Sequence, residues 1–360
     1  MNGTYKDIGK NILTDHSVMV HLPKVELHRH LEGTFDLPVL YAISMRNKLD
    51  VPSDFAEFKK FVAFPKDSGP DFLKFLSKFK TDWYRNFKDI EEIVYASIKN
   101  LVKDGIFYIE LRFNPEHYAL YNNFDRKEIT RLVVKYGNKA AKETGIHLKY
   151  LMTFNRMKQT SQEMIKLYDE LRDLNIPEIV GIDLAGDEVN YPPELFTEFF
   201  DYVQKDGKFL ITIHAGEVSP PQQIWDAIGL LHARRIGHGT SSINDPKLQK
   251  ELSKQKIVLE LCITSNYQTG SWPDESTHPL GRLFRAGVPV TINSDDPHIQ
   301  DTDLTEDYIK TVRNFNFDLD DLHTINHIAL DGSFLGAAER KALKIEYDKA
   351  FDEFVNKYCR

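Results

Sequence analysis

The chain alternates between short apolar runs and longer segments whose apolar positions recur at helical spacing. The short runs are rich in Val, Ile, Leu and Phe and mix apolar and polar residues only weakly, which is typical of parallel strands buried on both faces. Segments 90–102, 129–143 and 224–233 between them are amphipathic with the period of an α-helix. The predicted strands are 24–28, 106–113, 148–154, 179–185, 209–215, 234–239, 257–262 and 288–293.

Glycine and asparagine mark the ends of several predicted helices. Gly105, Gly145, Asn175 and Gly207 each stand shortly before a predicted strand, and both residue types accept the left-handed backbone conformation common at helix ends. Eight strands alternating with helices predict an α/β fold of the TIM type, a (β/α)8 barrel. A doubly wound open sheet is the alternative.

Residues 36–100, between the first and second predicted strands, are expected to form a largely helical insertion that caps the barrel. This insertion carries an aromatic run with the i, i+3, i+4 spacing of one helix face, and such stripes pack against a core more often than they form a binding wall. The run consists of Phe72, Phe75, Phe79 and Trp83. No low-complexity linker interrupts the pattern, so residues 1–360 are predicted to form a single domain.

Composition narrows the class of protein. A chain of 360 residues that is 41% hydrophobic can bury one large barrel core. The net charge of −8 argues against binding to nucleic acid or to an anionic membrane. Residues 1–20 contain no continuous apolar run of the kind found in a secretion signal, and no segment approaches the roughly 18 apolar residues of a membrane span. We therefore expect a cytoplasmic protein whose partner is a small molecule.

Polar side chains that can bind a metal or transfer a proton stand at the ends of several predicted strands. They are His28, His30, His214, His238, Asp295 and Asp296. Read singly, each histidine is ordinarily a structural residue, and the aspartate pair before Pro297 is ordinarily a helix cap. In a barrel, however, the carboxyl ends of all strands converge on one face, where active sites form. Side chains two residues apart on a strand share a face, so His28 and His30 can point at one ion.

Three imidazoles and one carboxylate, from His28, His30, His214 and Asp295, form a donor set that suits Zn²⁺ with one position open for water. Zinc lowers the pKa of bound water to about 7 and so supplies hydroxide at neutral pH. The predicted strand 179–185 carries no lysine to bridge two metals, which favours one zinc per chain.

Three side chains are candidates for moving or holding protons beside that metal. Glu217 follows His214 by three residues and is predicted to donate or shuttle a proton to a bound substrate. His238 is predicted to orient the hydroxide, and Asp295 to accept a proton from the water as well as to ligate the metal.

Six motifs in order, LPKVELHRHLEG, GIDLAGDE, ITIHAGE, RIGHG, CITSNYQTGSW and INSDDP, resemble the adenosine deaminase family of the amidohydrolase superfamily. The resemblance runs from about residue 22 to beyond residue 340. It implies a (β/α)8 barrel with one zinc that converts adenosine and 2′-deoxyadenosine to the inosines and ammonia. It also implies that the four ligands named above hold the zinc and that His238 positions hydroxide.

The same resemblance assigns the residues that contact the purine. Glu217 matches the acid that protonates N1, Asp296 the group that hydrogen-bonds N7, and the Gly186 backbone N–H the donor to N3. A further set resembles the hydrophobic helix that closes over the nucleoside. This set is Phe75, Leu76 and Phe79.

Glu32 departs from the family pattern, because many adenosine deaminases carry an aspartate there that bonds the ribose 5′-OH. Glutamate is common at this place in relatives that use adenine, and one extra methylene changes which 5′ substituent fits. The motif CITSNYQTGSW is closer to the nucleoside enzymes, so adenosine is the favoured substrate, with adenine and 5′-modified adenosines such as aminodeoxyfutalosine as alternatives. A non-catalytic nucleoside-binding protein is disfavoured by retention of Glu217 and all four ligands. Since the family includes monomers, a monomer is expected.

Overall fold

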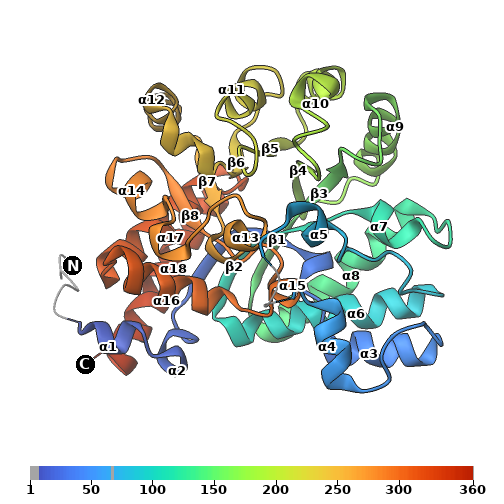
Figure 1. Ribbon diagram of the computed structural model, residues 1–360, viewed down its shortest axis with the longest axis horizontal. Helices are drawn as coiled ribbons and strands as arrows, with labels where there is room; N and C mark the ends of the chain where they lie inside the picture. Colours follow the sequence, from blue (N-terminus) through green and yellow to red (C-terminus); the bar gives the residue numbers. More distant parts are fainter. Residues whose placement is uncertain (1–7, 66–68, 360) are drawn as a thin grey trace.

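Eight parallel strands form the centre of the molecule (Figure 1), which we describe from a computed structural model of residues 8–65 and 69–359. The expected α/β barrel is therefore confirmed, and β1 extends two residues further than predicted, to His30, so that both of its histidines belong to the strand. Bounds of the strands are β1 (Lys24–His30), β2 (Ile106–Phe113), β3 (His147–Asn155), β4 (Ile179–Ala185), β5 (Leu210–Ala215), β6 (Arg235–His238), β7 (Val258–Leu261) and β8 (Val290–Ile292).

The strands pair in sequence order from β1 to β8, and the two ends of the sheet meet. The Asp295 amide donates to the His28 carbonyl at 3.0 Å, and the His30 amide donates to the Asp295 carbonyl at 3.0 Å. The open, doubly wound alternative is wrong, because such a sheet reverses its strand order and leaves two free edges. Closure also brings the end of β1 against the segment after β8, where the candidate metal ligands lie.

Helices surround the barrel (Figure 1). Short 3₁₀ turns, labelled η, connect several of the strands and helices. Bounds in the first half are α1 (Lys10–Leu13), α2 (His16–Met19), η1 (Leu31–Gly33), α3 (Leu37–Arg46), α4 (Phe55–Val62), α5 (Phe72–Leu76), α6 (Phe87–Asn100), η2 (Leu101–Asp104), α7 (Pro115–Ala119), α8 (Arg126–Thr144) and α9 (Ser161–Arg172). Bounds in the second half are η3 (Pro193–Phe196), α10 (Thr197–Asp206), α11 (Gln222–Gly229), η4 (Thr240–Asn244), α12 (Pro246–Gln255), α13 (Ile263–Gln268), η5 (Glu275–Thr277), α14 (Leu280–Arg285), α15 (Pro297–Gln300), α16 (Leu304–Phe315), α17 (Leu319–Gly332) and α18 (Ala337–Tyr358).

The residues expected at helix ends adopt the left-handed conformation. Gly105, Gly145, Asn175 and Gly207 have φ angles of 68°, 79°, 52° and 72°. The helix expected over 224–233 is shorter, because α11 ends at Gly229. The apolar spacing continued past that point because Leu231 and Ala233 are also buried, although they lie in the turn that leads into β6.

The aromatic run of the insertion does not lie on one helix. Helix α5 covers only Phe72–Leu76, and Phe79 and Trp83 follow it in irregular chain. Phe75 packs against Phe64, whereas Trp83 packs against Phe58 of α4 in the main core. A continuous helix could not deliver both rings to these two places. Residues 66–68 of the insertion, and residues 1–7 and 360 of the expected domain, lie outside the described residues.

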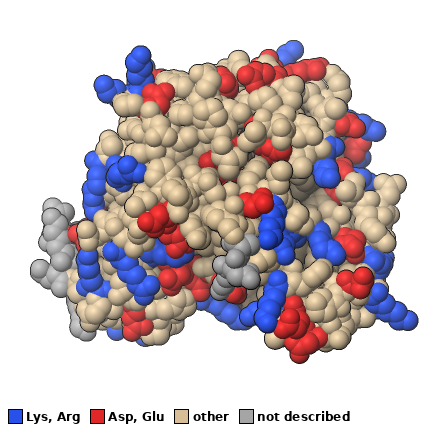
Figure 2. Space-filling view, viewed as in Figure 1, with Lys and Arg blue, Asp and Glu red and all other residues tan. Residues whose placement is uncertain are grey.

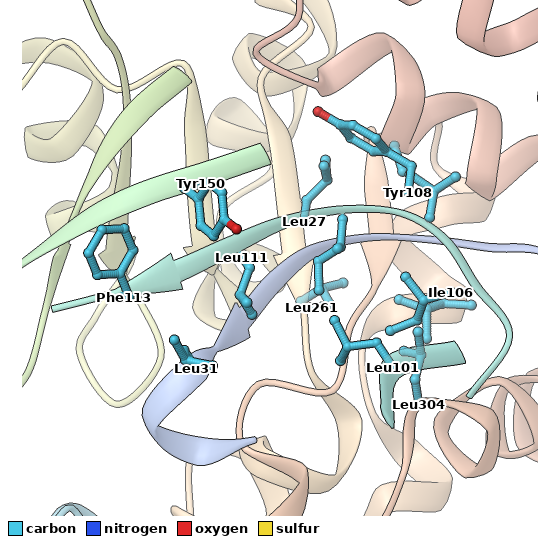
Figure 3. Packing of buried hydrophobic residues seen from close by; sticks show 14 of the residues in the cluster. Leu27, Leu31, Leu101, Ile106, Tyr108, Leu111, Phe113, Tyr150, Leu261 and Leu304 are labelled. Carbon is cyan, nitrogen blue, oxygen red and sulfur yellow. The ribbon is translucent and has the colours of Figure 1, made fainter. Parts of the chain in front are cut away.

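The main core lies around the strands. Leucines from β1, β2 and β7 pack together there with Tyr108 and Tyr150 nearby (Figure 3). The leucines are Leu27, Leu111 and Leu261, and all three are fully buried. This packing makes the strands a rigid frame for the side chains at their carboxyl ends.

The surface in Figure 2 shows lysine and arginine side chains interspersed with aspartate and glutamate, mostly toward the margins of the face and its lower half. This mixed pattern and the net charge of −8 agree with the expectation of a small-molecule partner. Across residues 8–65 and 69–359, no helix is long and apolar enough to cross a membrane.

Candidate active site

A cavity of about 600 Å³ opens at the carboxyl ends of the strands, and α5 forms part of its wall. All but one of the side chains predicted for the site line this cavity, and the exception, His28, is completely buried beneath it. The lining residues from the prediction are His30, Glu32, Phe75, Leu76, Phe79, Gly186, His214, Glu217, His238, Asp295 and Asp296.

Four donor atoms converge beneath the cavity. The Nε2 atom of His28 lies 3.2 Å from Oδ1 of Asp295, and Nε2 of His30 lies 3.4 Å from the same oxygen and 3.2 Å from Nε2 of His214. Tetrahedral ligands at about 2.1 Å from one zinc stand roughly 3.4 Å apart, which these three separations match. The donor atoms form two overlapping groups that could hold an ion, one of His28, His214, His238 and Asp295 and the other of His30, Asp183 and His214. Burial lowers the pKa of His214 and lowers that of His30 to about 3, which leaves both imidazoles neutral and able to ligate.

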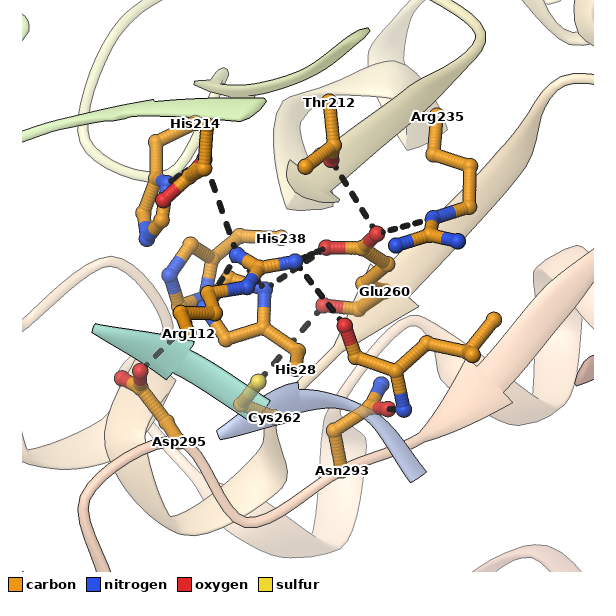
Figure 4. A network of polar contacts seen from close by, with 12 residues as sticks. His28, Arg112, Thr212, His214, Arg235, His238, Glu260, Cys262, Asn293 and Asp295 are labelled. Atoms are coloured by element: carbon orange, nitrogen blue, oxygen red, sulfur yellow. Dashed lines mark hydrogen bonds and ion pairs between the residues drawn. The ribbon is translucent and has the colours of Figure 1, made fainter. Parts of the chain in front are cut away.

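Hydrogen-bonding partners lie behind the candidate ligands (Figure 4). Nδ1 of His28 lies 2.8 Å from Glu260 of β7, and Nδ1 of His214 lies 2.9 Å from Asp183 of β4. Ser265 donates to Oδ2 of Asp295 at 2.7 Å. At His214 the Asp183 carboxylate accepts a hydrogen bond from Nδ1–H and so keeps Nε2 unprotonated for a metal, whereas Nδ1 of His28 also lies 2.8 Å from the Arg112 guanidinium.

Sequence reasoning missed these orienting residues, although a signal was present. Glu260 and Asp183 are charged residues inside otherwise apolar predicted strands, and both are fully buried. A buried carboxylate requires a paired or hydrogen-bonded partner. Glu260 has such partners in Arg112 and Arg235, which reach it across the barrel interior (Figure 4).

The backbone is unusual at two of the predicted residues. Asp295 and His238 have φ angles of 61° and 59°, in the left-handed region that non-glycine residues rarely adopt. At Asp295 this conformation accompanies the backbone bonds that close the barrel. Gly33 makes room for the neighbouring acid, because a Cβ atom at this position would lie 1.8 Å from Oδ1 of Asp296.

Glu217 has the properties of a proton donor. Its side chain is buried, and Oε2 lies 3.6 Å from Nε2 of His238. Burial, followed by the negative charges of Asp295 and Glu188, raises the pKa of Glu217 well above its usual value. A carboxyl group in this state keeps its proton at neutral pH and can give it to a base in the cavity.

Asp295 and Asp296 are adjacent in the chain but differ in protonation. Burial acts to raise the pKa of Asp295, but hydrogen bonding and attraction from His28 hold it well below its usual value. The pKa of Asp296 is raised well above its usual value by burial and by the charge of Asp295. The shifts favour the anionic form of Asp295, which can ligate a metal, and the neutral form of Asp296, which can donate a hydrogen bond.

Glu32 lies on η1, directly after β1, and faces the same cavity. Its Oε1 accepts a hydrogen bond from the Asn114 amide at 2.8 Å. Burial raises the pKa of Glu32 to about 8. Helix α5, in contrast to the polar Glu32, supplies an apolar wall of the cavity through Phe72, Phe75 and Leu76. Phe75 also packs against Ile299, so it serves both the packing and the wall.

Comparison with known proteins agrees with this geometry. A sequence model of the family described as adenosine deaminase matches residues 23–350. An adenosine deaminase from Shewanella denitrificans is 30% identical over 329 residues, which cover 89% of this chain and 97% of the relative. One from Escherichia coli is 29% identical over 329 residues, with 90% and 97% covered.

Solved structures share the fold. An amidohydrolase from Burkholderia ambifaria with bound Zn has a TM-score of 0.86 at 23% identity, covering 96% of this chain and 94% of its own. An adenine deaminase from Arthrobacter aurescens has a TM-score of 0.82 at 23% identity, covering 91% and 98%. The N6-mAMP deaminase from Arabidopsis has a TM-score of 0.78 at 23% identity, covering 92% and 99%. With a family match over most of its length and a relative at 30% identity, the chain belongs to the adenosine deaminase family.

Proposed function

We propose that this protein is a zinc-dependent hydrolase that converts adenosine and 2′-deoxyadenosine to inosine and deoxyinosine with release of ammonia. Family membership makes the chain a hydrolase of the C6 amino group of adenine-type purines. The observation that carries the proposal is Glu217, a buried carboxyl group in the same cavity as the candidate metal ligands, whose pKa is raised well above its usual value by burial.

The donor set would hold one zinc ion through His28, His30, His214 and Asp295. Zinc in such a site lowers the pKa of water to about 7 and so supplies a nucleophile at neutral pH. The bound Zn of the Burkholderia amidohydrolase supports this choice of metal.

The residues around the cavity would act on the purine ring. Glu217 donates its proton to N1, which draws electron density from the ring and makes C6 open to attack. Asp296, kept neutral by burial, donates a hydrogen bond to N7, and the Gly186 amide donates to N3. His238 holds the attacking oxygen in place against C6. A non-catalytic binding role is disfavoured, because nucleoside binding alone requires neither the acid nor the four donors.

The 5′ side of the substrate is the less constrained part of the proposal. The cavity of about 600 Å³ has the size of a typical small-molecule site, and Glu32 would contact the ribose 5′-OH. Adenine and 5′-modified adenosines remain the second candidates, because Glu32 stands where aspartate is common. A spectrophotometric assay with adenosine, 2′-deoxyadenosine, adenine and 5′-modified adenosines tests this directly. The proposal expects the nucleosides to give the highest kcat/KM, and a preference for adenine would overturn it.

Replacing Glu32 by Ala tests its contact with the ribose. We expect kcat/KM for adenosine to fall by about tenfold to a hundredfold, the effect of losing one hydrogen bond to a polar ligand group. Residual turnover of adenine, which has no ribose, should be unchanged and provides the internal control. Equal losses for both substrates would show that Glu32 acts on the purine or on the metal site instead.

Replacing Asp183 by Asn tests the orientation of His214. The amide cannot hold the Nδ1 proton as a carboxylate does, so affinity for zinc should fall by roughly tenfold to a hundredfold in a chelator competition. Asp307→Asn is the matched control, because Asp307 is an equally buried carboxylate that bonds Thr264 away from the donor set. Similar zinc affinities in the two variants would contradict the orienting role.

A further inference from the structure

Asn266 of the CITSNYQTGSW motif has no part in the proposed function, yet it lies directly behind His238. Its side-chain Nδ2 is 3.1 Å from Nδ1 of His238, and its Oδ1 is 3.0 Å from Nε2 of His278. On the far side, the backbone N–H of Leu280 donates to Nδ1 of His278 at 3.3 Å. His238, Asn266 and His278 are each at most 1% exposed, so water does not compete for these bonds.

The backbone N–H of Leu280 fixes the direction of every hydrogen bond in this series. A peptide N–H can only donate, so Nδ1 of His278 is an acceptor and carries no proton. Burial lowers the pKa of His278 to about 3, so the neutral ring has its single proton on Nε2. That proton is donated to the Asn266 carbonyl oxygen, which leaves the Asn266 NH₂ group facing His238.

His238 is the last member of the chain. An imidazole ring with one unprotonated nitrogen carries its proton on the other nitrogen. Nδ1 accepts a hydrogen bond from the Asn266 amide and must therefore be unprotonated. The ring proton is on Nε2, the atom that faces Glu217 and the cavity.

We propose that Asn266 and His278 are positioning residues that hold His238 as the Nε2–H tautomer, so that His238 acts in the site as a hydrogen-bond donor. The rings of His28 and His214 lie 4.6 and 5.2 Å from the His238 ring, centre to centre, and the hydrogen bond to Nδ1 comes from Asn266.

A fixed tautomer decides what His238 can do. With Nε2 protonated, the neutral ring donates to a lone pair of the attacking oxygen and cannot take that oxygen's proton. Asp295 or Glu217 must then receive it. This consequence rests on the proposed function, whereas the tautomer itself is a property of the folded chain and can be measured without turnover.

Nitrogen NMR of the zinc-loaded enzyme, labelled with ¹⁵N in histidine, measures the tautomer. The His238 signals are identified by their loss in His238→Asn. We expect the shifts and long-range proton couplings of an Nε2–H ring. An Nδ1–H ring, or a mixture of the two tautomers, would overturn the proposal whether or not adenosine proves to be the substrate.

Asn266→Asp should reverse the tautomer, because a carboxylate can only accept and would require a proton on Nδ1 of His238. We expect kcat to fall by about a hundredfold or more with KM within about twofold, together with the switched NMR signature. Asn326→Asp is the matched control, since Asn326 is an equally buried amide that bonds Val25 and Tyr308 outside the site. Loss of kcat without a tautomer change would overturn the proposal.

Variants of His278 keep the test decisive if Asn266→Asp does not fold. His278→Gln retains an N–H donor for the Asn266 oxygen, and we expect it to keep the Nε2–H tautomer and most of the wild-type kcat. His278→Leu removes that donor, frees the amide to rotate, and should lower kcat and populate both tautomers. Equal kcat and equal spectra in these two variants would refute the relay.

Discussion

We expect turnover of adenosine, the proposed substrate, to fall by about a thousandfold or more when Glu217 is replaced by Gln. Glutamine has the shape of the protonated glutamate and keeps its hydrogen-bonding atoms, but its amide is not acidic and cannot protonate N1. Without that proton the purine keeps its aromatic stabilisation, and C6 resists attack. The measurement is steady-state deamination at pH 7 with zinc content determined on the same samples, since the ligands are untouched and the metal should stay bound.

Measuring thermal stability distinguishes a loss of turnover caused by removing the acid from one caused by misfolding. The folded-state pKa of Glu217 is raised by burial, so above the unfolded pKa of about 4.3 the folded chain must retain a proton that the unfolded chain releases. Its contribution to stability is therefore lost as pH rises from that value toward the folded pKa. Glutamine at this position has no such penalty, so the variant should melt at or above the wild-type temperature at pH 8. Near-normal activity in a zinc-loaded variant would refute the assigned acid.

The second large effect is expected from removal of the proposed zinc ion. We expect metal analysis to find about one zinc per chain, and removal by a chelator to abolish deamination until zinc is restored. His214→Ala takes away one of four convergent donors, whose Nε2 lies 3.2 Å from that of His30. This variant should lose the metal and at least about a thousandfold in kcat, since the ion supplies several kcal/mol of activation.

A surface histidine controls for the loss of an imidazole as such. His147 is partly exposed and pairs with Glu346, and it begins β3, whose opposite end carries the cavity-lining residues Thr153 and Asn155. His147→Ala should therefore retain zinc and activity. Two tightly held metals in the wild type would contradict the mononuclear site. Full zinc content in His214→Ala would show that this histidine is not a ligand.

The sequence anticipated the arrangement of the barrel more closely than that of the insertion. Buried strands are rich in apolar residues and several helices end in residues that accept positive φ, so both leave a local signal. No predicted strand bound differs from the structure by more than two residues. The aromatic run after residue 71 has a helical period without a helix. Phe75 and Trp83 pack on different elements, and spacing alone cannot tell two packing partners from one.

The candidate site also combines features that the sequence predicted with features that only the folded chain shows. His28 and His30 are two residues apart on one strand, so their side chains point to the same face of the sheet, and the motif alone predicts this. Their partners Glu260 and Asp295 come from β7 and from the chain after β8. Only closure of the barrel brings such residues within hydrogen-bond distance.

By itself, then, the sequence determined the order of strands, the residues at their carboxyl ends and the family to which the chain belongs. Tertiary structure alone decided how the pKa values of these groups shift, because burial is the largest cause of the raised pKa values of Glu217, Asp296 and Glu32. It also decided how His238 is held, since His238 at the end of β6 meets Asn266 of α13, which in turn bonds His278, only in the folded chain. The sequence pattern shows which side chains are present, but their protonation and hydrogen bonding depend on the burial and the neighbouring groups that folding provides.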